Sequence, residues 1–145
     1  MIRTVLAVTV LAFGVSAVVA QGDPIAARQA LMKANGDQSR IATEMLNGKR
    51  PFDLDAAKKV FIVFAESGEK AKALFPDNSK TGGDTAALPA IWEKKADFDA
   101  MLTKFANESK AAAAATTNLD TFKAQITEVR KNCGGCHTPY RKKAS

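Results

Sequence analysis

The strongest constraint on this chain is a C-x-x-C-H sequence formed by Cys133, Cys136 and His137, which ends eight residues before the C-terminus. This pattern is the attachment signature of a c-type haem, in which two thiols bond to the porphyrin and the adjacent imidazole binds its iron. Positions i, i+3 and i+4 lie on one face of an α-helix. The motif therefore predicts a C-terminal helix that presents both cysteines and the histidine to a single haem c.

Three other interpretations of the motif require different surroundings. A structural zinc site takes about four nitrogen or sulfur ligands, whereas the chain has two cysteines and one histidine. A thioredoxin-like redox site expects a strand and a helix around the cysteines, and no strand pattern lies nearby. A Cys133–Cys136 disulfide would be local and would constrain little of the chain. Haem c, one per chain and covalently bound, is the interpretation that we favour.

Residues 1–20 have the pattern of a secretory signal peptide. Arg3 provides a positive start, residues 4–19 form an apolar run, and small residues up to Ala20 suit cleavage before Gln21. A membrane anchor is the alternative, but the run is short and no positive charge follows it closely. We expect export to the periplasm, cleavage, and one domain at residues 21–145 that does not stay inserted in a membrane.

The charge pattern argues against nucleic-acid binding and against an enzyme. The whole chain has a formal net charge of +6, with scattered lysines and no basic run that alternates with aromatic residues. The basic tail at residues 141–143 is interpreted as complementing the dipole at a helix C-terminus. Acidic pairs such as Asp53 with Asp55 suit helix caps and surface charges, and no acid–base or nucleophilic constellation accompanies the haem motif. We therefore expect no catalytic residues.

Capping residues and apolar periodicity predict four helices. The expected helices run from Pro24 to about residue 47, from Asp53 to about residue 75, from about residue 89 to 115, and from Asn118 or Asp120 to the motif. Residues 77–87 form the one long loop, Lys95 is a misfit on the apolar stripe of the third helix, and no segment has the period of a strand. The predicted fold is all-α, an antiparallel four-helix bundle.

The apolar stripe of the last helix runs directly into the motif. Its members are Leu119, Phe122, Ile126, Val129, Cys133, Cys136 and Tyr140. Because the two cysteines continue this stripe in phase, we expect the haem to lie inside the bundle and to fill one end of its core.

Together, the four helices, the export signal and the motif on the last helix resemble the cytochrome c-prime family, the class II cytochromes c. The resemblance covers residues 21–145. In that family an aromatic–arginine pair commonly follows the motif, as Tyr140 and Arg141 do here, and an arginine precedes the distal residue by one helical turn. The sequence Arg28-Gln29-Ala30-Leu31-Met32 is similar to this second pattern and places Met32 on the distal side of the iron.

The family divides at this distal position. Members with a non-coordinating apolar residue keep five-coordinate iron and bind small gases, whereas members with methionine are the low-spin cytochromes c-556. The sequence from Leu31 to Gly36 resembles the second branch. The resemblance implies a one-electron carrier with His137 as proximal and Met32 as distal iron ligand. A five-coordinate protein that binds nitric oxide or carbon monoxide is the alternative, and a haem-containing sensor or structural module is a third hypothesis.

The residues themselves leave part of the distal site open. A methionine on an apolar helix face is usually core filler, yet Gly36 lies one turn after Met32 and leaves room for a flat cofactor. Met45 and Met101 are poorly placed as ligands. Arg28 is expected either to contact a haem propionate or to be a solvated helix charge. The same two alternatives apply to Arg141, which would contact the haem near its proximal edge. The redox partner proteins and the formation of a homodimer are not determined by the sequence.

Overall fold

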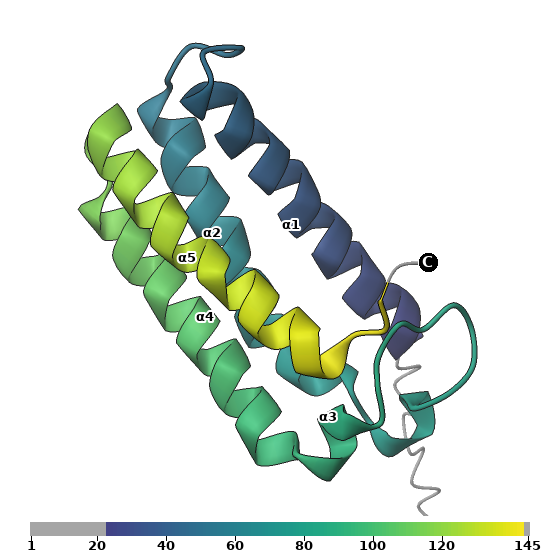
Figure 1. Cartoon of the computed structure of the whole chain (residues 1–145). Coiled ribbons are helices and arrows are strands. Elements are labelled where there is room, and N and C mark those ends of the chain that lie inside the picture. The colour runs from purple at the N-terminus through teal and green to yellow at the C-terminus, as the bar shows by residue number, and fades with distance from the viewer. Residues whose placement is uncertain (1–22, 144–145) are drawn as a thin grey trace, which may run out of the picture.

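Four long helices run antiparallel to their neighbours along the chain in the computed structural model, which describes residues 23–143 (Figure 1). They are α1 (Pro24–Leu46), α2 (Leu54–Ala71), α4 (Lys95–Ala115) and α5 (Leu119–Tyr140). The shorter elements are two 3-10 turns, η1 (Lys72–Leu74) and η2 (Asp77–Ser79), and the four-residue helix α3 (Ala90–Glu93). The predicted all-α, antiparallel four-helix bundle is confirmed. The predicted signal peptide lies outside the described residues.

The helix ends follow from their capping residues. Asp23 accepts a hydrogen bond from the backbone N–H of Ile25 at 2.8 Å, and Pro24 occupies the first position of α1. Asp53 caps α2 through the N–H of Ala56 at 2.6 Å. At α5, Asn118 and Thr121 form a reciprocal capping box. No helix in the described part of the chain is long and apolar enough to span a membrane.

The prediction of one continuous third helix is wrong, because two helices occupy this stretch of the chain. Lys94 has φ −123° and ψ 46°, which is outside the helical region, so α3 ends there and α4 begins at Lys95. The indole N–H of Trp92 donates to the carbonyl of Phe75 at 3.0 Å and thereby anchors α3 to the end of the α2–η1 segment. The break also explains the misfit at Lys95, which opens the new helix and pairs with Asp99 at 2.5 Å.

Two clusters of buried side chains fill the bundle. The first is built around Phe61, Phe64 and Phe122 and contains Met45, which is 2% exposed. The second lies at the end where α5 finishes and contains Phe98 and Tyr140, with Leu31, Trp92 and Cys136 packed against it. The motif is therefore placed beside the second cluster.

The expected start of the α5 stripe is wrong. Leu119 is 39% exposed, and the buried stripe of α5 begins at Phe122. Leu119 is the first residue of the helix, directly after the capping Asn118.

Some pairs of helices in the bundle pack more closely than others. Contacts between α2 and α4 are the most extensive in the bundle, whereas α1 and α5 contact each other sparsely. The closest approach depends on Gly68 of α2, where a β-carbon would lie 2.9 Å from the carbonyl oxygen of Leu102 and 3.1 Å from the β-carbon of Ala106. The bundle is tight on the α2–α4 side and more open on the α1–α5 side.

This close approach makes Gly68→Ala a test of the packing. The new methyl group must push α2 and α4 apart, at a cost of roughly 1–3 kcal/mol, which outweighs the gain of about 1 kcal/mol in helix propensity. We expect a lower midpoint in denaturant unfolding. The control is Ser109→Ala on α4, whose hydroxyl is buried without a partner among the described residues, so its removal should be neutral or stabilising. Equal stability of Gly68→Ala and the parent would contradict the packing described here.

Candidate haem-binding site

The motif occupies the last two turns of α5, so Cys133, Cys136 and His137 share one helix face as expected. Both thiols are free. Cys136 and His137 are half-buried, and Cys136 packs against the second cluster. Cys133 is exposed and lies two helical turns after the buried Ile126, in phase with the stripe. The apolar stripe of α5 reaches the surface at the motif, beside the sparsely packed α1.

The local geometry fits a flat group bound at this face. A β-carbon placed at Gly36 of α1, one turn after Met32, would meet no atom within 4 Å. On α1, the side-chain oxygen of Asn35 is buried and has no hydrogen-bond partner among the described residues. A buried acceptor without a partner is costly. Two free thiols, an adjacent imidazole and this open α1–α5 face therefore fit a covalently attached haem.

Desolvation sets the protonation states of the motif. Burial is the main cause that raises the pKa of the Cys136 thiol, and partial burial likewise raises that of Cys133 although the residue is exposed overall. Burial, and then the positive charge of Arg141, lower the pKa of His137. The imidazole is therefore neutral at neutral pH, which is the form that binds a metal ion.

Polar contacts hold the turn of α5 before the motif on two sides. Arg130 donates to the carbonyl oxygen of Ser39 at 2.6 Å and to the hydroxyl of Thr43 at 2.9 Å, which ties α5 to α1. Asn132, adjacent to Cys133, ties α5 to α4 in the same way. Sequence analysis did not identify either residue, because their partners lie on other helices.

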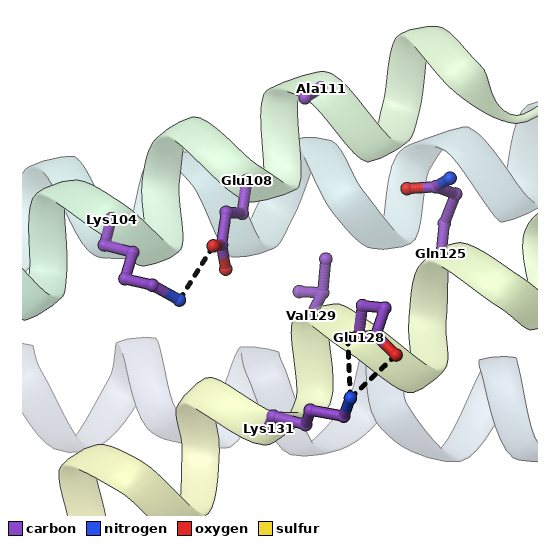
Figure 2. A pocket seen from close by; sticks show the side chains of 7 residues that line it. All are labelled: Lys104, Glu108, Ala111, Gln125, Glu128, Val129 and Lys131. Atoms are coloured by element: carbon purple, nitrogen blue, oxygen red, sulfur yellow. Dashed lines mark hydrogen bonds and ion pairs between the residues drawn. The ribbon is translucent and has the colours of Figure 1, made fainter.

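The Asn132 contacts border a shallow groove between α4 and α5 (Figure 2). Asn132 accepts from Lys104 at 3.0 Å and donates to Glu108 at 2.6 Å. The groove has a volume of about 270 Å³, and its charged residues are paired, Lys104 with Glu108 at 2.7 Å and Lys131 with Glu128 at 2.6 Å. These pairs account for all the charged residues that line the groove, so it presents no unpaired charge.

Met32 lies on α1 at the same end of the bundle as the motif. Ser39 and Thr43 are opposite Arg130 on the antiparallel α5, so residues nearer the start of α1 lie opposite residues nearer the motif. Leu31, next to Met32, packs against the cluster that also contacts Cys136. Met32 itself is 41% exposed, so it is not core filler.

Arg28 is buried, so one of its two expected environments is wrong. It is 6% exposed, which rules out a solvated helix charge. Its two terminal nitrogens donate to the carbonyl oxygens of Leu74 and Ser79 and to the hydroxyls of Ser79 and Thr85, at 2.5 to 3.1 Å. The guanidinium also lies 4.9 Å from the ring centre of Phe75. These donors are committed to the loop after α2, which leaves only the Nε–H for a propionate.

Arg141 lies directly beside the predicted proximal ligand. Its backbone N–H donates to the carbonyl oxygen of His137 at 3.1 Å, and its side chain is exposed. Arg141 also forms an isolated antiparallel bridge with Ala87, so the end of α5 is paired with the loop that precedes α3.

Comparison with known proteins agrees with this architecture. A family model described as Cytochrome C' matches residues 23–141. The cytochrome c' of Rhodopseudomonas palustris is 42% identical, over 99% of this chain and 97% of its own sequence. The cytochrome c-556 of the same organism is 33% identical, over 99% of both chains.

Solved structures give the same result for the fold. The structure of a cytochrome c' from Rhodopseudomonas palustris superposes with a TM-score of 0.82 at 42% identity, covering 86% of this chain and all of that one. An NMR-validated structural model of oxidised cytochrome c556 from the same organism superposes with a TM-score of 0.78 at 30% identity, and again covers 86% of this chain and all of that one. The chain therefore belongs to the cytochrome c' family of class II cytochromes, which bind covalent haem c and its iron, and this confirms the predicted cofactor.

Proposed function

We propose that the protein is a periplasmic one-electron carrier whose haem iron is bound by His137 and Met32. The observation that carries this proposal is the placement of Met32 on α1 at the motif end of the bundle, opposite the helix that carries His137. Haem c supplies the redox chemistry when bound. Cys133 and Cys136 would hold it by two thioether bonds, and the neutral imidazole of His137 would occupy one axial position.

The proposed role of Met32 follows from ligand chemistry. A thioether is a soft ligand that raises the potential of a haem iron compared with stronger donors. With both axial positions filled by the protein, electron transfer needs no exchange of ligand. No proton-transferring group is required, and none is proposed, so the protein is not proposed to be an enzyme. Its partners would be other redox proteins of the same compartment.

The proposed periplasmic location depends on the signal-peptide pattern of residues 1–20, called the leader below. The family match begins at residue 23, directly after the segment with a signal-peptide pattern. Attachment of haem to a C-x-x-C-H motif is expected after export. We therefore propose that residues 1–20 are removed and that residues 21–145 act in the periplasm.

A five-coordinate, gas-binding site is the second candidate, and two observations favour it. The side chain of Met32 is 41% exposed and thus is not fixed against the motif by surrounding protein. The relative named cytochrome c' is also more similar in sequence than the relative named cytochrome c-556. In this candidate Met32 would border the distal side without binding iron.

Mass spectrometry tests the leader and the attachment together. The exported protein should begin near Gln21 and carry one haem that resists extraction with acidified acetone. Replacing both Cys133 and Cys136 by serine should abolish covalent attachment. It should also destabilise the bundle by several kcal/mol, because a large apolar group is lost from its site. Haem that is extracted from the parent protein, or a retained leader, would contradict this part of the proposal.

Visible spectroscopy of Met32→Leu separates the two candidate functions. If the Met32 sulfur binds iron, both oxidation states of the parent protein should be low-spin at neutral pH. Carbon monoxide should then bind slowly, because it must displace the thioether. The variant should become five-coordinate and high-spin, bind carbon monoxide readily and have a lower potential.

Met45→Leu serves as a control and should do none of this, since Met45 is buried in the first cluster. Met101→Leu is a second control: Met101 lies on α4 and packs against the second cluster, but it is not the proposed ligand. A parent ferrous protein that is already high-spin would overturn the electron-carrier proposal and favour gas binding.

A further inference from the structure

Helices α1 and α5 are joined by polar contacts at two levels, on either side of the site. At one level, Arg130 of α5 donates to Ser39 and Thr43 of α1. At the other level, the connection is indirect and runs through the loop between η1 and α3. Met32 and His137 lie between these two levels. The two connections therefore flank the site on both helices.

The indirect connection begins at Arg28. This guanidinium is nearly fully buried and donates twice to Ser79, at 3.0 Å to the hydroxyl and 3.0 Å to the carbonyl oxygen. It also donates to the hydroxyl of Thr85 at 2.5 Å. The rings of Phe75 and Trp92 cover it, with centres at 4.9 and 6.0 Å. A buried cation is tolerated only when its hydrogen bonds are satisfied, so the loop and Arg28 hold each other in place.

Thr85 links Arg28 to the segment that pairs with the end of α5. Its hydroxyl, which accepts from Arg28, also accepts from the backbone N–H of Ala87 at 3.2 Å. The next residues pair with the end of α5: Leu88 donates to the carbonyl oxygen of Tyr140 at 3.0 Å, and Lys142 donates to that of Ala86 at 2.8 Å. The paired segment starts one helical turn after His137.

We propose that Arg28, acting through Thr85 and residues 86–88, is a positioning residue that fixes the separation of α1 from α5 at the haem. Its guanidinium would hold the start of α1 to the end of the helix that carries the motif. The inference rests on the proposed ligation by Met32 for its effect at the iron. Its effect on the segment that pairs with α5 is independent of that ligation.

The first variant keeps the charge and removes the planar set of donors. Arg28→Lys has one ammonium group, which cannot reach four acceptors in the geometry of a guanidinium. Hydrogen exchange should quicken by roughly tenfold or more at the amides of Leu88 and Lys142, which Arg28 itself does not contact. The matched control is Arg40→Lys on the same helix, where the arginine is exposed and, within residues 23–143, pairs only with Glu44. It should leave both amides unchanged.

The second measurement is made at the iron of the same holoproteins. Arg28→Lys should raise the association rate of carbon monoxide with the ferrous form by roughly tenfold or more, since a displacement of about 1 Å suffices to disturb a fixed geometry. The same substitution should add little in a Met32→Leu background, because the two changes act on one contact. Arg40→Lys should match the parent.

A milder variant covers the case in which Arg28→Lys fails to fold. Thr85→Val keeps the shape of the side chain and removes the hydroxyl that links Arg28 to Ala87. It should quicken exchange at Leu88 and Lys142 in the same way. Its control is Thr127→Val on α5, where the exposed hydroxyl bonds only to the carbonyl oxygen of Lys123 at 2.8 Å.

The outcomes separate the two proposals. Unchanged exchange at Leu88 and Lys142 in both Arg28→Lys and Thr85→Val would overturn the positioning role, whatever the ligand of the iron. Quickened exchange with an unchanged rate for carbon monoxide, in a protein where Met32→Leu does raise that rate, would overturn only the effect on the site. If Met32→Leu changes nothing, the proposed ligation fails, and quickened exchange would still support the connection from Arg28 to α5.

Discussion

Two thiols and one imidazole must share a single helix face, and the rest of the structure depends on this requirement. It fixes α5 as a helix through its last turn and sets which of its faces looks towards α1. The bundle meets the requirement with unequal packing. Gly68 lets α2 and α4 approach closely, so the bundle is tightly packed between these two helices. By contrast, α1 and α5 contact each other sparsely, which leaves the motif open.

Polar contacts compensate for the sparse packing on the open side. Arg130 and Asn132 hold the turn before Cys133 to α1 and α4, and Arg28 holds the loop that pairs with the end of α5. These contacts are directional, and each partner is specified by geometry. Apolar packing alone would not fix the separation of two helices that contact each other sparsely and of which α1 has no side chain at Gly36.

The elements that sequence analysis predicted correctly are those determined by neighbouring residues. Asp23 with Pro24, Asp53 and Asn118 fix the starts of three helices through local hydrogen bonds. The motif placed the cysteines and the histidine on one helix face without knowledge of the other helices. The four-helix architecture followed from periodicity, which reflects the packing of each helix as a whole.

The errors concern residues whose environment is made by distant parts of the chain. The break at Lys94 accompanies the anchoring of Trp92 to Phe75, seventeen residues earlier. The solvated alternative for Arg28 is wrong because its acceptors at Ser79 and Thr85 lie more than fifty residues away along the chain. The break left one local signal, the misfit of Lys95 on the apolar stripe, whereas the burial of Arg28 left none.

X-ray absorption at the iron edge reports the atoms bound to the metal in the unsubstituted protein and so tests ligation by Met32. We expect one sulfur neighbour of the iron, in addition to nitrogen, in both the oxidised and the reduced protein at neutral pH. That sulfur can come only from a methionine, since both cysteine sulfurs are bonded to the edge of the porphyrin. Iron with nitrogen neighbours alone in the reduced protein would contradict the assignment of Met32 as the distal ligand.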